Sequence, residues 1–514
     1  MVEINNIELM RLQLQAELDS RKTRHSRNKL GQFATPTALA TDMLEYAKAL
    51  LPGNIRFLDP AFGTGSFYSA LLKTFPSSQI AEAVGYEISP DYGLQASEFW
   101  QDRPLKLKID DFTRATPPTS EAAKFDLIIA NPPYIRHHHL TNPEKQRLQN
   151  ITYQTVGIKL SQLAGMYCYF LCLADAWMAE NAIAGWLIPS EFMDVNYGKQ
   201  IQEYLLSRVT LLHIHRFDPQ DLLFADALVS SAVIWLKKIR PTTDRMVKFT
   251  YGGSLKAPQV EKYIPIEGLG DTAKWKNFIV PHFRSDDKSL KLSDLFTIKR
   301  GLATGANQFF ILTPEQIDRH QLPEEFLKPI LPSPRYLSVE EIAADLAGNP
   351  LVDRQLFLLA CHLPEAEVKS KYPALWNYLL LGVKAGYSQR YLCRHRCPWY
   401  LQENRPASMF LCTYMGRKGQ KTGLTFRFIL NHSRATAANV YLMLYPKPNL
   451  EKILNINRQL VKVVWQGLQE ISSEILAGEG RVYGGGLHKL EPKELGNATA
   501  KNILAVLPAS FGRH

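Results

Sequence analysis

Short apolar runs recur along the first half of the chain, separated by segments with helical spacing. Such runs predict buried strands and the intervening segments predict helices. The predicted strands cover residues 55–59, 81–87, 105–109, 125–130, 184–189, 211–216 and 228–236, and the predicted helices cover 36–50, a segment ending near 73, 162–181 and 197–208. Strands that alternate with helices predict an α/β fold with a doubly wound, mostly parallel sheet of seven strands.

The fourth predicted strand ends abruptly. Phe125–Ala130 is apolar apart from Asp126 and is followed by Asn131-Pro132-Pro133-Tyr134. Prolines cannot continue a strand ladder, so this tetrapeptide lies at the carboxyl end of a strand. Ligands bind at that edge of an open α/β sheet, and the prolines fix the direction of the Asn131 amide and a carbonyl. We expect a functional loop here, against the alternative of a proline-terminated strand with a core tyrosine.

Three further strand ends carry residues suited to a nucleoside. After the first strand, Asp59-Pro60-Ala61-Phe62-Gly63-Thr64-Gly65 offers a tight turn and close approach of a ligand to the backbone. Tyr68 replaces the third glycine of a dinucleotide fingerprint, which disfavours NAD. Glu87 ends the second strand, where it is placed to accept both ribose hydroxyls. Asp110 and Asp111 follow the third strand and are, by themselves, equally consistent with helix capping.

Size and composition indicate a globular protein of two domains. A chain of 514 residues exceeds what one core usually organises, and 46% hydrophobic with 21% charged residues is ordinary. No uncharged run reaches the roughly 18 residues of a membrane helix, and the first 20 residues lack the apolar core of a signal peptide. We expect a cytoplasmic protein of bacterial type with no membrane partner. The Pro- and Gly-rich stretch 241–270 predicts the domain boundary.

The net charge of +11 is unevenly distributed. Residues 1–240 carry −1 and residues 241–514 carry +12, of which residues 381–450 hold +10. Cations interspersed with aromatic residues indicate a polyanion partner, although a merely basic surface would have the same composition. Arg21–Lys29 is a second basic run, which either touches phosphate or is simply solvated.

Cysteine and histidine clusters give little sign of a metal. The spacing of Cys393, His395 and Cys397 fits no paired zinc pattern, so we expect no metal site. Cys168 and Cys172 lie at helical spacing and are interpreted as core residues. His137–His139, directly after the Asn-Pro-Pro-Tyr motif, is interpreted as a solvated or DNA-facing loop.

The order of these motifs resembles a known family. Lys29–Pro36, the glycine turn, Glu87, Asp111 and Asn131–Tyr134 follow one another as in the γ class of S-adenosylmethionine-dependent DNA amino-methyltransferases, the modification enzymes of restriction systems. The resemblance covers about Lys29 to Lys238. It implies a Rossmann-like class I methyltransferase domain over residues 31–240. The apolar spacing of residues 1–20 separately predicts an amphipathic helix, so residues 1–30 are expected to form an N-terminal helix and basic arm. It also implies adenine N6 as the target, although cytosine N4 presents the same amino group.

The resemblance also implies roles for individual residues. Asn131, Pro132, Pro133 and Tyr134 would form the catalytic loop, and Phe224, in preference to Phe217 or to a core role, would close the site on an extruded base. The cofactor S-adenosyl-L-methionine would be held by Thr35, Asp59, Ala61, Gly63, Gly65, Glu87, Ile88, Asp111, Phe112 and Asn131.

The second half resembles target-recognition domains more loosely, in Leu292–Asn307, Arg427–Asn431 and the segment from Tyr483 to Leu495. We expect a mixed α+β domain over residues 241–514 that binds double-stranded DNA. Phosphate contacts would give affinity, and a smaller set of side chains would read base edges. The candidates are Arg417, Lys418, Arg427, Asn431 and Arg434.

Taken together, these features predict a monomeric DNA adenine-N6 methyltransferase that protects DNA from a cognate restriction endonuclease, to which it is related by function rather than by stable binding. No nuclease motif is found, so a fused restriction activity is not expected. An RNA base methyltransferase and a catalytically silent DNA-binding partner are the alternatives. Glutamine methylation of release factors is disfavoured because those enzymes end soon after their catalytic domain.

Overall fold

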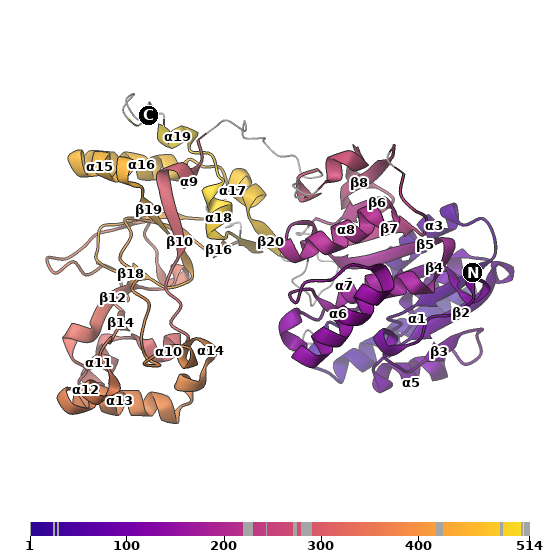
Figure 1. Ribbon diagram of the computed structural model, residues 1–514, viewed down its shortest axis with the longest axis horizontal. Helices are drawn as coiled ribbons and strands as arrows, with labels where there is room; N and C mark the ends of the chain where they lie inside the picture. The colour runs from indigo at the N-terminus through magenta and orange to yellow at the C-terminus, as the bar shows by residue number, and fades with distance from the viewer. Residues whose placement is uncertain are drawn as a thin grey trace. The chain divides into compact units, whose positions relative to one another are not determined.

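The computed structural model describes residues 2–23, 26–27, 30–218, 230–242, 244–270, 275–278, 290–417, 425–483, 487–504 and 507. The chain divides into two compact units, residues 1–281 with 483–485 and residues 282–482 with 486–514. Each unit has its own sheets and hydrophobic cores (Figure 1).

The first unit is built around a nine-stranded sheet in the order β3-β2-β1-β4-β5-β7-β6-β8-β9. Its strands are β1 (Ile55–Asp59), β2 (Ile80–Tyr86), β3 (Lys106–Lys108), β4 (Phe125–Ala130), β5 (Met178–Pro189), β6 (Thr210–Arg216), β7 (Ser231–Lys237), β8 (Met246–Gly253) and β9 (Pro258–Pro265). Strand β7 is antiparallel to β5 and β6, β9 is antiparallel to β8, and the other pairs are parallel. The expected α/β fold with a mixed, mostly parallel sheet is confirmed.

Helices cover both faces of this sheet. Leu58 and Ile128 face the core formed with α6 (Asn142–Val156), α7 (Met166–Leu173) and α8 (Lys199–Ser207). Phe57, Leu127 and Ile129 face the core formed with α3 (Thr37–Leu50), α4 (Ser66–Thr74) and α5 (Pro90–Phe99). Successive strand residues point to opposite faces, so an unbroken apolar run gives a strand that is buried on both sides.

The structure differs from the sequence prediction in two places. The predicted helix 162–181 is wrong, because α7 ends at Leu173 and β5 begins at Met178, which pairs with Phe125 of β4. Pairing with a central strand outweighs the helical spacing of these residues. The sheet has nine strands where seven are predicted, since β8 and β9 continue it beyond residue 240. The first unit therefore extends to residue 281.

The N-terminal helix α1 (Val2–Ser20) belongs to the first unit and packs on α4 and α5. Leu18 is buried, and so is the charged side chain of Arg11. The helix is predicted correctly, but its docking against the glycine turn is not predicted.

The second unit contains three smaller sheets, in the orders β10-β19-β15-β17-β13, β11-β14-β12-β18 and β16-β21-β20. Their strands are β10 (Phe296–Arg300), β11 (Ile311–Leu312), β12 (Leu327–Leu331), β13 (Glu341–Ile342), β14 (Phe357–Leu359), β15 (Phe410–Thr413), β16 (Met415–Gly416), β17 (Phe428–Asn431), β18 (Thr436–Ala437), β19 (Tyr441–Pro446), β20 (Arg481–Tyr483) and β21 (Leu487–Lys489). The longer helices are α11 (Pro314–His320), α12 (Glu365–Lys371), α13 (Pro373–Lys384), α15 (Pro448–Ile456), α16 (Gln459–Gln469) and α17 (Ser473–Glu479). The unit is mixed α+β, as expected. Within the described ranges, every helix is too short or too polar to cross a lipid bilayer.

Candidate functional site

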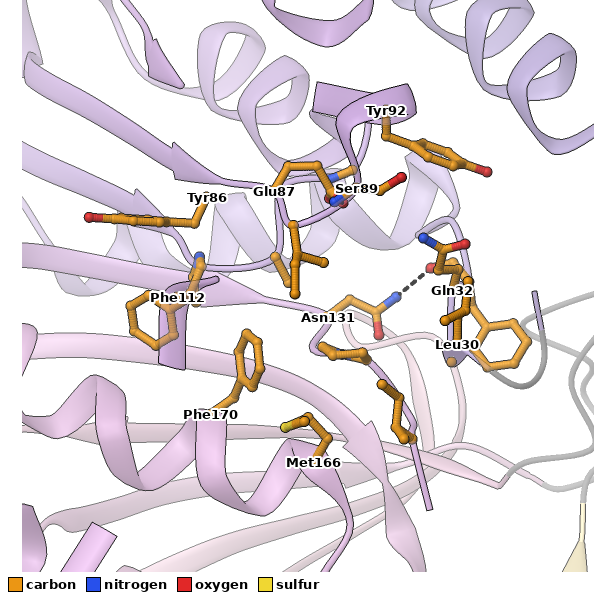
Figure 2. Close-up of a pocket in the computed structure, with 18 of the residues that line it drawn as sticks. Leu30, Gln32, Tyr86, Glu87, Ser89, Tyr92, Phe112, Asn131, Met166 and Phe170 are labelled. Carbon is orange, nitrogen blue, oxygen red and sulfur yellow. Dashed lines mark hydrogen bonds between the residues drawn. The ribbon is translucent and has the colours of Figure 1, made fainter. Parts of the chain in front are cut away.

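A cavity of about 490 Å³ opens where β1, β2 and β4 end. Figure 2 shows Tyr86, Phe112 and Phe170 at one end of it, Glu87 in the middle, and Leu30, Gln32 and Asn131 at the other end. The aromatic end suits a flat ring, the carboxylate suits hydroxyl groups, and the amide suits a polar atom. The cavity therefore has the polarity pattern of a nucleoside with a polar extension.

The side chain of Asn131 is held in one orientation. Its Nδ2 donates to the Phe33 carbonyl at 2.8 Å and to Thr35 Oγ1 at 3.2 Å. A backbone carbonyl only accepts hydrogen bonds, so the amide nitrogen must face it and the amide oxygen must face away. Within the described chain no donor reaches that oxygen, and Asn131 lines the cavity. The structure thus presents a fixed, available acceptor at the predicted functional loop.

The segment before α3 lies directly on this loop. Gly31 has φ +64°, and its carbonyl accepts the Tyr134 amide at 3.2 Å. A Cβ on residue 31 would lie 2.3 Å from the Tyr134 nitrogen, so only glycine allows the two segments to touch. This contact brings Phe33 and Thr35 to Asn131. Thr35, assigned by resemblance to the cofactor, is buried and contacts Asn131, whereas the contacts of Gly31 and Phe33 with this loop were not predicted.

The other three residues of the tetrapeptide differ in how they are placed around Asn131. Pro133 lines the cavity, whereas Pro132 and Tyr134 are buried and are not among its described lining residues. The Tyr134 hydroxyl donates to the Leu187 carbonyl at 3.2 Å, and burial raises its pKa well above the usual range. Tyr134 therefore ties the loop to β5. Phe224 lies outside the described residues, and its competitor Phe217 is buried against His215.

The two glycines of the turn serve different purposes. Gly63 (φ +57°) lines the cavity, and a Cβ there would meet no atom within 4 Å and would project into open space. Its amide donates to Glu87 Oε2 at 2.9 Å, while the Ser89 amide donates to Oε1 at 2.8 Å. Burial raises the pKa of Glu87. Gly65 (φ +89°) is needed for packing, because a Cβ would lie 2.7 Å from both Phe62 and Trp100.

Asp59 lies beneath this turn. Its Oδ1 accepts the Ala61 amide at 3.1 Å, and Oδ2 is buried with no partner among the described residues. Burial, reinforced by the Glu87 charge, raises its pKa to about 8. Ala61 and Ile88 line the cavity, but Asp59 is not among the residues found to line it. Asp59 thus shapes the turn from inside the fold.

The aromatic end is built on Phe112. Its ring lies 5.6 Å from Tyr86 and 5.5 Å from Phe170, centroid to centroid. Asp111 also lines the cavity, and its Oδ1 accepts both the backbone amide and the hydroxyl of Thr113 at 2.9 and 2.8 Å. The helix-capping role considered for Asp111 is therefore present. Its Oδ2 lies 3.2 Å from Arg114 Nε.

Helix α1 supplies cavity residues that the motifs did not indicate. Gln15 and Asp19 line the cavity, and Asp19 accepts the Tyr92 hydroxyl at 2.6 Å. Thr64 of the glycine turn donates to Gln15 at 2.7 Å and accepts from Arg11 Nη1 at 2.9 Å. The buried Arg11 also pairs with Glu8 at 2.7 Å. The sequence gave no sign that Arg11, a charged residue of this helix, would be buried.

Two of the predicted base-reading residues are committed to the fold of the second unit. Asn431 is buried; its Nδ2 donates to the Ser408 and Ala435 carbonyls, and its Oδ1 accepts from the Ser433 amide and hydroxyl. Arg427 donates to the Leu337 carbonyl at 3.0 Å and to the Pro334 carbonyl at 2.7 Å. Both side chains thus hold turns of this unit in place.

The structure describes two of the remaining three candidates. Arg417 and Arg434 are exposed, and Lys418 lies outside the described residues. The turn held by Arg427 carries Arg335 and Tyr336, which form part of a basic and aromatic cluster that the sequence did not single out. Arg335 and Arg354 each place their guanidinium 4.9 Å from the ring centre of the exposed Tyr336. Among the described residues no group of histidines, cysteines and carboxylates is arranged to hold a metal ion.

Comparison with known proteins places this geometry in context. A family model described as "Eco57I restriction-modification methylase" matches residues 73–224, and one described as "Type II methyltransferase M.Eco57I, C-terminal domain" matches residues 276–507. The chain is 26% identical over 486 residues to the type II methyltransferase M.XamI of Xanthomonas campestris pv. amaranthicola, covering 92% of this chain and 85% of the relative. It is also 26% identical to M.AccI of Acinetobacter calcoaceticus, with 91% and 85% covered.

The fold is shared with two proteins solved in complex with DNA. The type IIL enzyme MmeI, solved with DNA, aligns with a TM-score of 0.50 and 14% identity over 98% of this chain and 74% of its own. The DrdV–DNA complex aligns with the same TM-score and identity over 82% of this chain and 50% of its own. At this identity the likeness concerns the fold.

Proposed function

We propose, for a chain that belongs to the type II restriction-modification methyltransferase family, that it transfers a methyl group to the N6 amino group of an adenine in duplex DNA. The modification would protect that DNA from a cognate endonuclease, and the chain would act as a monomer. The observation that supports the proposal most is the Asn131 amide oxygen, held in place and available at the cavity.

The chemistry asked of this oxygen is positioning. The amino nitrogen of a base is a poor nucleophile because its lone pair is delocalised into the ring. If the Asn131 oxygen and the Pro132 carbonyl each accept one of its hydrogens, the nitrogen is held near tetrahedral geometry and its lone pair points to one side. A preorganised acceptor does this without reorganisation during the reaction.

The cofactor is S-adenosyl-L-methionine, whose sulfonium carries an activated methyl group. The cavity residues fit its parts. Tyr86, Phe112 and Phe170 offer rings to the adenine, and Glu87 offers acceptor capacity to the ribose hydroxyls. The open space beside Gly63 leaves room for a ligand to approach the backbone. No metal is needed, since the leaving group is already charged.

A base in a duplex must leave the stack to reach Asn131, which costs a few kcal/mol. Stacking on an aromatic ring recovers about 1–3 kcal/mol. Tyr134 is packed inside the fold, so in our proposal it fixes the loop, and Phe33, which lines the cavity, is the aromatic side chain available beside Asn131. Phe224 keeps its proposed role in closing the site.

Methyl transfer to duplex DNA, RNA and protein, measured with tritiated cofactor, tests the proposal. Label is expected in duplex DNA, and nucleoside analysis should identify N6-methyladenine. Asn131→Ala should lower the rate by about 10²–10³-fold, the cost of removing one preorganised hydrogen-bonding group. Cofactor affinity, measured by calorimetry, should change far less.

Asn150→Ala is the matched control, because Asn150 is an exposed asparagine on α6. Label in RNA alone would refute the choice of substrate. N4-methylcytosine as the product would refute the adenine assignment, and an absence of label in every substrate would favour a silent DNA-binding protein.

A further inference from the structure

A cluster of basic side chains follows in the sequence directly after a residue that lines the cavity. Ile135 lines the cavity, Arg136 follows it, and His137–His139 form the short turn η4. Arg136, His138 and His139 are exposed. The ring centres of His138 and His139 lie 4.2 Å apart, and those of His137 and His138 lie 5.4 Å apart. These nitrogen-bearing side chains are crowded together and follow directly in the sequence after Ile135, which lines the cavity.

No carboxylate balances this cluster. In the part of the chain that the structure describes, neither Arg136 nor Lys145 has an ion pair, and no acidic group pairs with the three histidines. Glu144, in the first turn of α6, is already paired with Arg114 at 2.9 Å and with Arg147. Uncompensated positive charge at the rim of a cavity attracts an anion.

We propose that Arg136, His138 and His139 bind the phosphodiester groups that flank the nucleotide inserted into the cavity. The proposal rests on the proposed function, since it requires a polynucleotide substrate. A base that enters the cavity stays joined to its strand through its own phosphates. These phosphates must lie at the rim, and Ile135 is the point at which the catalytic loop leaves the cavity.

The histidines should make this phosphate contact depend on pH. Burial, together with the neighbouring cations Arg136 and Lys145, lowers the pKa of His137, and burial and the adjacent imidazoles lower that of His138. In the free protein the neutral forms of His137 and His138 are therefore favoured. A nearby phosphate stabilises the imidazolium form, so binding takes up protons and affinity rises as the pH falls from about 8 to about 6. Glu144 adds little to this balance, because its charge is met by two arginines.

The test compares the wild-type chain with the variant R136Q/H138Q/H139Q on a duplex that the wild-type chain methylates. Affinity is measured at about pH 6 and about pH 8 over a range of salt concentrations. The variant should bind at least about 10-fold more weakly at pH 6, lose most of the pH dependence, and show a salt slope reduced by about 1–2. Lys73→Gln, which removes an exposed cation at the end of α4, should match the wild type. Cofactor affinity should be the same in all three proteins, which shows that the variant is folded.

Competition by inorganic phosphate should equal that of chloride at the same ionic strength, because a phosphodiester within a strand is the expected ligand. If inorganic phosphate competed with DNA more strongly than chloride at the same ionic strength, the cluster would be a site for a free anion and the proposal would be overturned. Unchanged affinity and pH dependence in the triple variant would overturn it while leaving the proposed function intact. A wild-type chain that neither binds nor methylates duplex DNA would overturn both.

Discussion

Two regions of this chain are rich in polar side chains, and they use them in opposite ways. At the sheet edge of the first unit, Asn131, Glu87 and the Gly63 amide each have a partner and converge on one cavity. In the basic stretch 381–450 of the second unit, Asn431 and Arg427 instead form hydrogen bonds that hold turns of their own unit. The backbone at a strand end fixes where a side chain points. A high net charge, by contrast, does not indicate which side chains face a ligand.

Breaking the polar network behind the sheet edge should have the largest effect. Arg11→Met leaves Glu8 without its buried partner, which should lower the free energy of unfolding by about 3 kcal/mol and weaken cofactor binding through Gln15 and Asp19. Denaturant unfolding and calorimetry measure both. Arg21→Met is the control, since Arg21 directly follows the same helix and its pair with Glu17 is exposed and worth only a few tenths of a kcal/mol. Equal effects of the two substitutions would contradict the description of α1 as part of the site.

A second prediction tests whether Asn431 stabilises the fold of the second unit rather than reading a base. Asn431→Ala removes four hydrogen bonds from a buried side chain and should lower the stability of this unit by about 2 kcal/mol. Asn377→Ala, at an exposed position on α13, should have no measurable effect. A stable Asn431→Ala protein with an altered DNA recognition sequence would restore Asn431 as a base reader.

Asp59 gives a pH signature confined to the sheet edge. Its raised pKa, about 8, means that the folded protein keeps the proton while the unfolded chain releases it near pH 4. Ionisation therefore stabilises the unfolded state, and the free energy of unfolding of the cofactor-free protein should fall as the pH rises from about 4 to about 8. Asp59→Asn should make this fall smaller and leave the part due to Glu87, whose pKa burial also raises, whereas Asp110→Asn, at an exposed position, should not change it. Parallel pH profiles for all three proteins would show that Asp59 ionises normally.

The smallest effect is expected from the exposed cluster of the second unit. Replacing Arg335 and Arg354 by glutamine should weaken DNA binding by about 10-fold and reduce its salt slope by about 1–2, because both side chains are exposed around Tyr336. Arg319→Gln on α11 removes another exposed cation and serves as the control. If the control has the same effect, binding follows the overall charge of the unit rather than this cluster.

The sequence was most informative where an interaction is local. The Asn-Pro-Pro-Tyr strand end, the glycine turn and Glu87 each follow directly from a strand, and their convergence follows from the parallel sheet. It was misleading at residues 174–181, where helical spacing conceals the start of β5. It was also misleading for Asn431, because the same amide serves a buried turn or a base edge equally well.

Sequence alone determined the α/β class, the sheet edge that carries the cavity and the position of the Asn-Pro-Pro-Tyr loop, because apolar runs and the prolines that end a strand are local features, each spanning a few residues. Tertiary structure decided which atom of Asn131 is available, that Gly31 seats the preceding segment on Tyr134, and that α1 forms part of the cavity wall. These depend on contacts between segments about 50 to 100 residues apart in the chain, and such contacts leave no periodic signal in either segment.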